Sequence, residues 1–120
     1  MIRTLSRLAF YVGLLLVVIL SLIPQDVMPT TGVSDKANHV AAYTALALAG
    51  GVGFRGLRWL MLVAAGLLLL GASLELAQSL LPDHVASLYD LLADAIGIVL
   101  GALLATGTNT VWLRHRLTGG

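Results

Sequence analysis

The sequence contains no cysteine, and charged residues make up only 11% of its 120 residues. Without cysteine the protein has no disulfides, thiolate nucleophiles or zinc–thiolate sites. It also has no basic stripe with interleaved aromatic residues, so nothing in the sequence supports nucleic-acid binding. A soluble domain carries roughly 25% charged residues, which places this chain far outside the soluble class.

Hydrophobic residues are abundant instead: they make up 58% of the chain and gather in four long runs. The first run ends at Pro24, Arg55–Arg58 separates the second from the third, and the third ends at Pro82. A membrane span needs about 20 apolar residues, and backbone groups in lipid must pair within a helix. We therefore expect an all-α fold, a single-domain integral membrane four-helix bundle, with helices roughly over residues 5–23, 35–54, 57–81 and 86–112.

The distribution of positive charge predicts the orientation. Six of the seven Lys and Arg residues lie before the first run, between the second and third, or after the fourth: Arg3, Arg7, Arg55, Arg58, Arg114 and Arg116. Because positive residues mark the cytoplasmic side, we expect a multi-pass protein with both termini in the cytoplasm. A cleaved signal peptide is a rival reading of the N-terminus, but no A-x-A-like cleavage site follows the first run.

Polar residues within the apolar runs are expected at a similar depth, in the outer half of the bilayer. At 1.5 Å per residue, His39 lies about 6 Å below the start of its helix, Glu75 about 9 Å below the outer end of the third, and Asp94 about 10 Å inside the fourth. Such residues are costly in lipid and indicate a functional site by default. Gly71 and the Gly97-x-x-x-Gly101 pair would let helices approach closely there. We expect one outward-facing cavity lined by His39, Tyr43, Glu75, Gln78, Asp90 and Asp94.

Structural roles compete with functional ones for several of these residues. Asp35 and Lys36 suit a helix start at the lipid headgroups, and Tyr43 and Gln78 suit interhelical hydrogen bonds. Glu75 is harder to explain by packing, because an intramembrane carboxylate is expensive. Histidine and carboxylates are suitable metal ligands, but the sequence has no H-E-x-x-H or comparable spacing, so we predict no metal and no cofactor.

Three motifs of the sequence resemble those of the VanZ-like family. Ser34–Tyr43 is similar to the family's D-K-x-x-H-x-x-x-Y signature, Glu75–Gln78 to its E-x-x-Q element, and Asp90–Gly101 to its last element. The order, the spacings and the four-span layout agree, and the resemblance covers nearly the whole chain. Two positions depart from the pattern, since His84 stands where the family usually has arginine and Asp94 where it usually has asparagine.

The resemblance implies a protein of the bacterial cytoplasmic membrane that is linked to the cell envelope and to resistance to glycopeptides, specifically teicoplanin. It implies no settled reaction, so whether the protein is an enzyme stays open. Our first hypothesis is that it binds or modifies an outer-leaflet envelope lipid or a lipid-linked wall precursor. The candidate catalytic residues are then Glu75, His39 and Asp94, and the candidate substrate-binding residues are Asp35, Lys36, Tyr43, Gln78, His84 and Asp90.

Two alternatives belong to other functional classes. Four spans, about this length and a buried glutamate also describe small proton-coupled multidrug transporters, but the carboxylates here gather near one membrane face rather than at the midplane, where transport sites usually lie. A structural accessory subunit, in which the polar residues only hold the helices together, is the other alternative. The sequence does not predict an oligomeric state.

Overall fold

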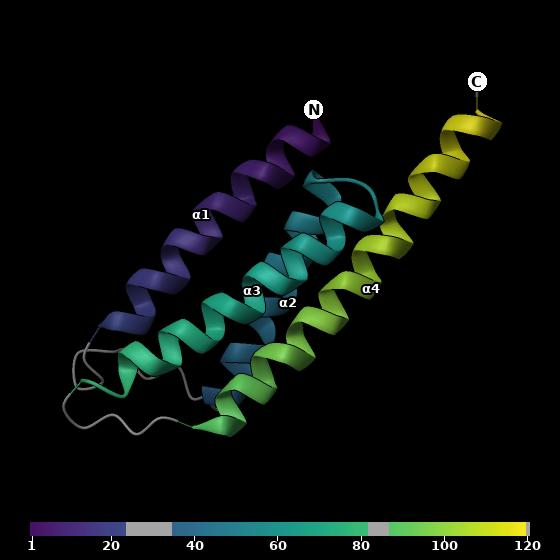
Figure 1. Ribbon diagram of the computed structural model, residues 1–120. Coiled ribbons are helices and arrows are strands. Elements are labelled where there is room, and N and C mark those ends of the chain that lie inside the picture. The colour runs from purple at the N-terminus through teal and green to yellow at the C-terminus, as the bar shows by residue number, and fades with distance from the viewer. Residues whose placement is uncertain (24–34, 82–86, 120) are drawn as a thin grey trace.

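The computed structural model describes residues 1–23, 35–81 and 87–119, and within these ranges it contains four α-helices and no strand. They are α1 (Ile2–Leu22), α2 (Asp35–Gly53), α3 (Leu57–Gln78) and α4 (Leu88–Thr118). The helices lie alongside one another and alternate in direction, so that the start of α1 and the end of α4 lie at the same end of the bundle (Figure 1). The predicted all-α fold is confirmed.

Three of the described helices, α1, α3 and α4, are long and apolar enough to cross a membrane. Their outer surfaces carry large apolar side chains, such as Leu15, which is 61% exposed, and Leu69, which is 69% exposed. So much exposed apolar surface is unfavourable in water, which indicates a membrane protein. The second helix is less apolar, so length and composition support three of the four predicted spans.

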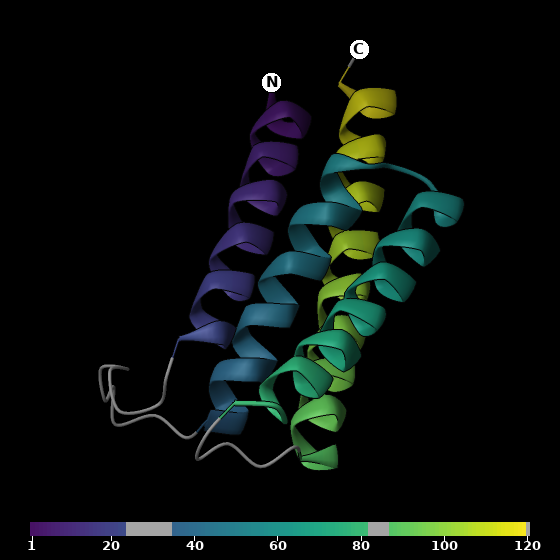
Figure 2. The same cartoon turned by 60° about the vertical axis from the view of Figure 1, so that its left-hand side comes forward.

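The less apolar helix, α2, contacts all three others, as α3 also does, and its most extensive contact is with α4. It lies between α1 and α3, with α4 packed along its far side (Figure 2). The buried cluster at the centre of the bundle is formed by Tyr43, Leu46 and Ala47 of α2, together with Val63, Leu67 and Ile98 from the neighbouring helices. This central position explains how α2 tolerates polar and small residues, because its neighbours cover much of its surface.

Two glycines of α4 bring its backbone against that of α2. A Cβ atom added at Gly97 would lie 2.6 Å from the carbonyl oxygen of Val40, and one added at Gly101 would overlap the carbonyl oxygen of Thr44. The close approach predicted from the Gly97-x-x-x-Gly101 pair is therefore confirmed, and α2 is the helix that fills the space. This contact sets His39, one residue before Val40, beside the acidic residues of α4.

The bounds of all four helices differ from the predicted ones: α1 runs from Ile2 to Leu22 rather than over 5–23, and α2 ends at Gly53 rather than 54. The third helix ends at Gln78 rather than 81, and α4 runs from Leu88 to Thr118 rather than over 86–112. The prediction ended α4 where the apolar run ends, but a helix continues as long as its backbone hydrogen bonds do. In α4 they continue to the C-cap residue Gly119, whose N–H donates to the carbonyl oxygen of His115. At 1.5 Å per residue α4 is about 46 Å long, so it exceeds a hydrocarbon core of about 30 Å.

Candidate functional site

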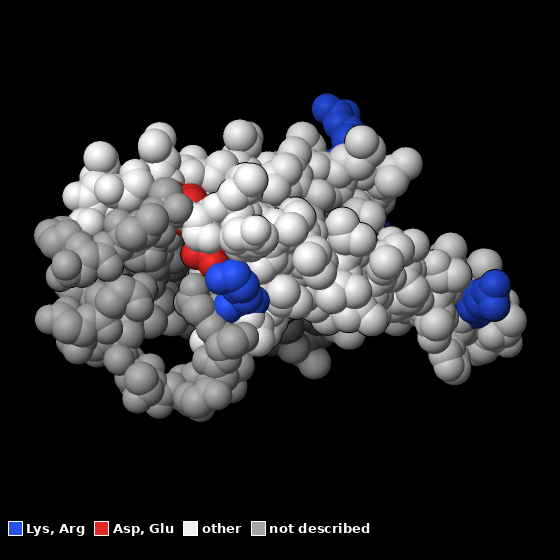
Figure 3. Space-filling model, turned by 90° about the horizontal axis from the view of Figure 1, so that it is seen from below, with Lys and Arg blue, Asp and Glu red and all other residues white. Residues whose placement is uncertain are grey.

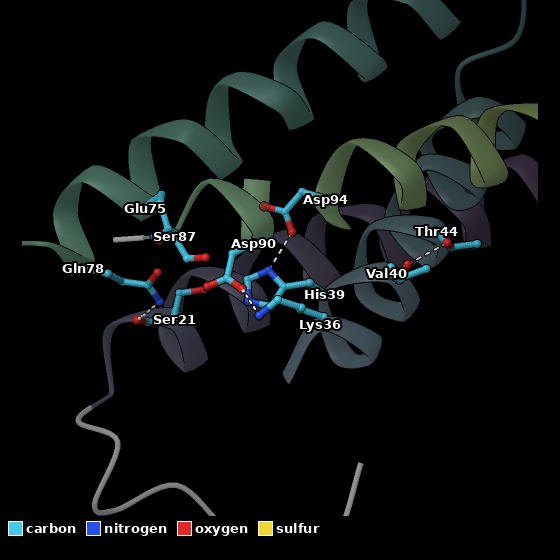
Figure 4. Close-up of polar contacts among 10 residues, drawn as sticks. All are labelled: Ser21, Lys36, His39, Val40, Thr44, Glu75, Gln78, Ser87, Asp90 and Asp94. Carbon is cyan, nitrogen blue, oxygen red and sulfur yellow. Dashed lines mark hydrogen bonds and ion pairs between the residues drawn. The ribbon is translucent and has the colours of Figure 1, made fainter. Parts of the chain in front are cut away.

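Five ionisable side chains lie near the end of the bundle opposite the chain termini. We call them the polar cluster; they come from α2, α3 and α4 and are Lys36, His39, Glu75, Asp90 and Asp94 (Figure 4). Viewed from below, acidic atoms reach the surface beside a group of basic atoms at this end of the molecule (Figure 3). The sequence predicted that residues from three apolar segments would meet at one depth, and the structure brings them together.

The most buried member of the cluster is Asp94, which is 2% exposed. His39 Nδ1 donates to Asp94 Oδ1 at 2.6 Å, across 55 residues of sequence. A carboxylate removed from water needs such a partner, because an uncompensated buried charge is strongly destabilising. The pair joins the start of α2 to α4 and supplies an imidazole and a carboxylate between which a proton can be shared.

Gly71 of α3 makes room for the carboxylate of Asp94. A Cβ atom at this position would lie 2.7 Å from Asp94 Oδ2 and 3.4 Å from the hydroxyl oxygen of Tyr43. Asp94 and Tyr43 therefore meet against the backbone of α3, and a larger residue at position 71 would displace one of them. The meeting of helices predicted near Gly71 is confirmed, and Tyr43 contributes to the buried core.

Asp90, one helical turn before Asp94, is buried but incompletely paired. It is 6% exposed, and its nearest described cation is Lys36, with 3.6 Å between Nζ and Oδ1. That separation makes an ion pair but is too long for a hydrogen bond. Within the described residues, Asp90 Oδ1 is the buried side-chain atom that lacks a hydrogen-bond donor. Buried acceptors are nearly always satisfied in folded proteins, so this oxygen is the atom of the cluster whose hydrogen bonding is incomplete.

Glu75 has a partner that sequence reasoning missed. Its Oε1 accepts a hydrogen bond of 2.5 Å from the backbone N–H of Ser87, the N-cap residue of α4. Ser87 makes no side-chain capping bond of its own, so Glu75 caps α4 from the neighbouring helix. A carboxylate is stabilising at this position, because the N-terminus of a helix carries partial positive charge. The short connection between α3 and α4 was the sequence signal for this contact.

Gln78 holds two helices together. It is buried, and its Nε2 donates to the carbonyl oxygen of Ser21 in the last turn of α1 at 2.7 Å. Carbonyl groups in the last turn of a helix have no partner within that helix. The interhelical hydrogen bond considered for Gln78 from the sequence is therefore confirmed, and its predicted contact with a substrate stays a prediction.

The remaining predicted site residues lie outside the described part of the structure. These are His84, within the segment 82–86, and the side chain of Asp35, whose backbone begins α2. Their proposed contacts with a substrate stay predictions. Within the described ranges, no three histidine or acidic side chains come together in a group that could hold a metal ion.

A separate apolar groove of about 420 Å³ lies between α1 and α3, toward the chain termini. Its lining includes Phe10, Tyr11, Leu14, Phe54 and Trp59, and none of its residues is ionisable at neutral pH. The groove suits hydrocarbon rather than proton transfer. The polar cluster is thus the candidate for chemistry.

No family model, curated protein or solved structure matches this chain. The resemblance to the VanZ-like family therefore rests on the three sequence motifs alone. The structure gives the arrangement of their residues: His39 meets Asp94, Lys36 meets Asp90, and Glu75 meets the start of α4.

Proposed function

We propose that this protein is a multi-pass protein of the bacterial cytoplasmic membrane that binds the headgroup of an envelope lipid or of a lipid-linked wall precursor. The polar cluster is the binding site and opens to the outer leaflet. The observation that carries the proposal is the buried oxygen of Asp90, which has an ion-pair partner but no hydrogen-bond donor. A ligand with an ammonium or hydroxyl group would supply that donor.

The placement of the cluster at the outer leaflet rests on charge. Both chain termini and the α2–α3 connection lie at the opposite end of the bundle (Figure 1), and these segments carry six of the seven Lys and Arg residues. Because positive residues favour the cytoplasmic side, that end is cytoplasmic in our proposal. The second helix then crosses the membrane with the others, since it lies between them and contacts all three.

The charges of the cluster favour a headgroup that carries both a donor and an anionic group. Asp90 would accept from the donor, whereas Lys36, whose side chain is 57% exposed, would turn toward a phosphate. The buried pair of His39 and Asp94 lies one turn deeper and can accept or release a proton. That capacity supports the hypothesis that His39, Asp94 and Glu75 take part in catalysis, which the binding function does not require.

The motif resemblance supports a link between this site and glycopeptide resistance. Teicoplanin-type drugs act outside the cytoplasmic membrane, where the cluster lies in our topology. Expression of the protein in a susceptible bacterium tests the link, with teicoplanin susceptibility as the measurement. If replacement of Asp90 leaves the resistance unchanged, the polar cluster is not the cause of the resistance.

Lipid analysis of the purified protein tests the binding function. Asp90→Asn keeps the volume of the side chain but removes the charge, and we expect it to reduce the bound headgroup lipid about tenfold, since a hydrogen bond to a charged group contributes roughly 1.5–3 kcal/mol. Asn109→Leu is the matched control, because it removes a partly buried amide that is already bonded to Gly51 and lies outside the polar cluster. Equal lipid retention by wild type and Asp90→Asn would refute the proposal.

The structural alternative has its own support. The bond from Ser87 to Glu75 and the bond from Gln78 to Ser21 each hold helix ends together. If the cluster is purely structural, the wild type and Asp90→Asn should bind the same amount of lipid. Asp90→Asn would then change only the stability of the bundle. Transport has no comparable observation in its favour, because Glu75 lies in the last turn of α3 and Asp90 in the first turn of α4.

A further inference from the structure

Three arginines from separate parts of the chain converge on one indole ring at the end of the bundle that carries the termini. Their guanidinium carbons lie 4.2 Å (Arg116), 4.9 Å (Arg55) and 5.8 Å (Arg3) from the centre of the Trp112 ring. Arg3 belongs to the first turn of α1, Arg55 to the α2–α3 connection, and Arg116 to the last turn of α4. Arg116 lies one helical turn after Trp112 in α4, and the fold brings Arg3 and Arg55 to the same ring.

The arginine cluster lacks a negative partner in the described part of the chain. The described acidic side chains, Glu75, Asp90 and Asp94, belong to the last turn of α3 and the first turns of α4, at the other end of the bundle (Figure 1). Neither a hydrogen bond nor an ion pair to another described residue engages the three guanidinium groups. Attraction to the face of an indole stabilises each cation, but it does not cancel the repulsion among three like charges.

Arg7, at the same end of the bundle, has a hydrogen-bond acceptor within the protein. Its Nε donates to the carbonyl oxygen of Gly53 at 2.8 Å, and its guanidinium stacks on Phe54. The carbonyl group belongs to the last residue of α2, where partial negative charge accumulates. Among the described residues, Arg3, Arg55 and Arg116 have no such acceptor, so their N–H donors are available to a ligand.

We propose that the arginine cluster on Trp112 binds the phosphodiester of an anionic phospholipid. Guanidinium groups present several N–H donors in a plane that matches phosphate oxygens. Tryptophan is enriched at the level of the headgroups, and the apolar outer faces of α1 and α4 begin within a turn of the cluster, where the acyl chains would lie. This inference requires membrane insertion but not the function proposed for the polar cluster.

The cluster is distinct from a diffuse basic surface because only some of the arginines at this end contact Trp112. Arg58 and Arg114 are exposed, and neither contacts the ring. A diffuse attraction to anionic lipid would depend on the total charge and would weaken equally when any two arginines are removed. A site would weaken only when the arginines of the cluster are removed.

Trp112 itself provides the measurement. The chain has two tryptophans, so a Trp59→Phe background leaves Trp112 as the sole fluorophore. In lipid discs we would compare its quenching by brominated phosphatidylglycerol and by brominated phosphatidylcholine, each normalised to unbrominated lipid. We expect a preference of about fivefold for phosphatidylglycerol, the ratio that corresponds to the attraction of roughly one basic side chain to an anionic surface.

Two double variants decide between a site and a diffuse charge effect. R3Q/R116Q should remove most of the preference, and R58Q/R114Q, which removes the same charge, should keep more than about half of it, because attraction over a distance is screened by salt. Equal losses in the two variants would overturn the proposal. R3K/R116K keeps the charge at both positions and is the charge control. Circular dichroism of each variant distinguishes loss of the site from loss of folding.

A final comparison identifies the source of the phosphate. Inorganic phosphate added to discs of phosphatidylcholine should leave Trp112 fluorescence unchanged if the site requires a lipid. A saturable response to inorganic phosphate that equals the response to phosphatidylglycerol would overturn the lipid assignment. Phosphatidylglycerol preference without any phosphate response is the result that the proposal predicts.

Discussion

Asp94 illustrates how much a single buried carboxylate depends on its partner. Its Oδ1 accepts from His39 and its Oδ2 lies against Gly71, so the side chain is enclosed by α2, α3 and α4. Removing one member of a buried ion pair costs more than removing both, because the remaining charge has no compensation. This asymmetry can be measured.

The first prediction concerns this pair. His39→Leu should destabilise the bundle by about 3–5 kcal/mol, since it leaves Asp94 buried without its partner, and His39→Leu/Asp94→Leu should recover most of that loss. The measurement is unfolding of the purified protein by a denaturing detergent. If the double variant is less stable than His39→Leu, the pair is not the main role of either residue in stability.

The second prediction concerns Glu75. Glu75→Gln keeps an oxygen that can accept from the N–H of Ser87, so we expect normal insertion and folding but loss of the phenotype that the wild type confers. Glu75→Ala should in addition destabilise the start of α4 by about 1 kcal/mol, because it leaves the partly buried N–H of Ser87 without its acceptor. Full activity of Glu75→Gln at wild-type expression would favour a structural role for Glu75.

At the scale of elements, the interface between α2 and α4 decides which residues meet. Gly97 and Gly101 let the two backbones touch at Val40 and Thr44, and this contact fixes the rotation and the axial position of each helix. His39 then faces Asp94 rather than lipid. A change in this interface should therefore affect both the stability of the bundle and the geometry of the polar cluster.

The third prediction tests that interface. Gly101→Ala places a methyl group against the backbone of α2 and should destabilise the bundle by about 1–3 kcal/mol, the usual cost of overpacking. Gly107→Ala is the matched control on the same helix, because nothing lies within 4 Å of its added Cβ atom. The control should be neutral or more stable by up to about 1 kcal/mol, from the better helix propensity of alanine. Equal stability of the two variants in detergent unfolding would contradict this account of the interface.

At the scale of the whole molecule, charge and hydrophobicity are arranged along one axis. The start of α1 and the end of α4 carry arginines and lie together, and the described carboxylates lie at the other end of the bundle. Between them the outer surface is apolar. This arrangement matches a bilayer, with one polar region at each headgroup layer.

The fourth prediction tests the topology of the molecule. Because the chain has no cysteine, a single cysteine can be introduced at Thr31 or at Gly120 and probed with a thiol reagent that does not cross membranes. We expect labelling of Thr31→Cys in intact cells and protection of Gly120→Cys until the cells are opened, since positive residues mark the inner side. The reverse pattern would refute cytoplasmic termini and, with them, the outer-leaflet placement of the polar cluster.

The sequence by itself determined the class of the protein and the depth of its polar residues. Apolar runs of sufficient length, broken at proline and arginine, predict helices because lipid offers no hydrogen bonds to the backbone. Helix rise alone brings His39, Glu75 and Asp94 to a similar level. These properties depend only on distance along the chain, so they can be derived without knowing which helices are neighbours.

Only the tertiary structure decided which of these residues are partners. From the sequence, Glu75 could pair with either His39 or Asp94. In the structure His39 binds Asp94, and Glu75 caps α4. The fold also brings Arg3 and Arg55 to Trp112, beside Arg116, which lies one turn further along the same helix. The physical reason is that a helix presents side chains in every direction around its axis, and only the packing of its neighbours, here at Gly97 and Gly101, fixes which direction faces which partner.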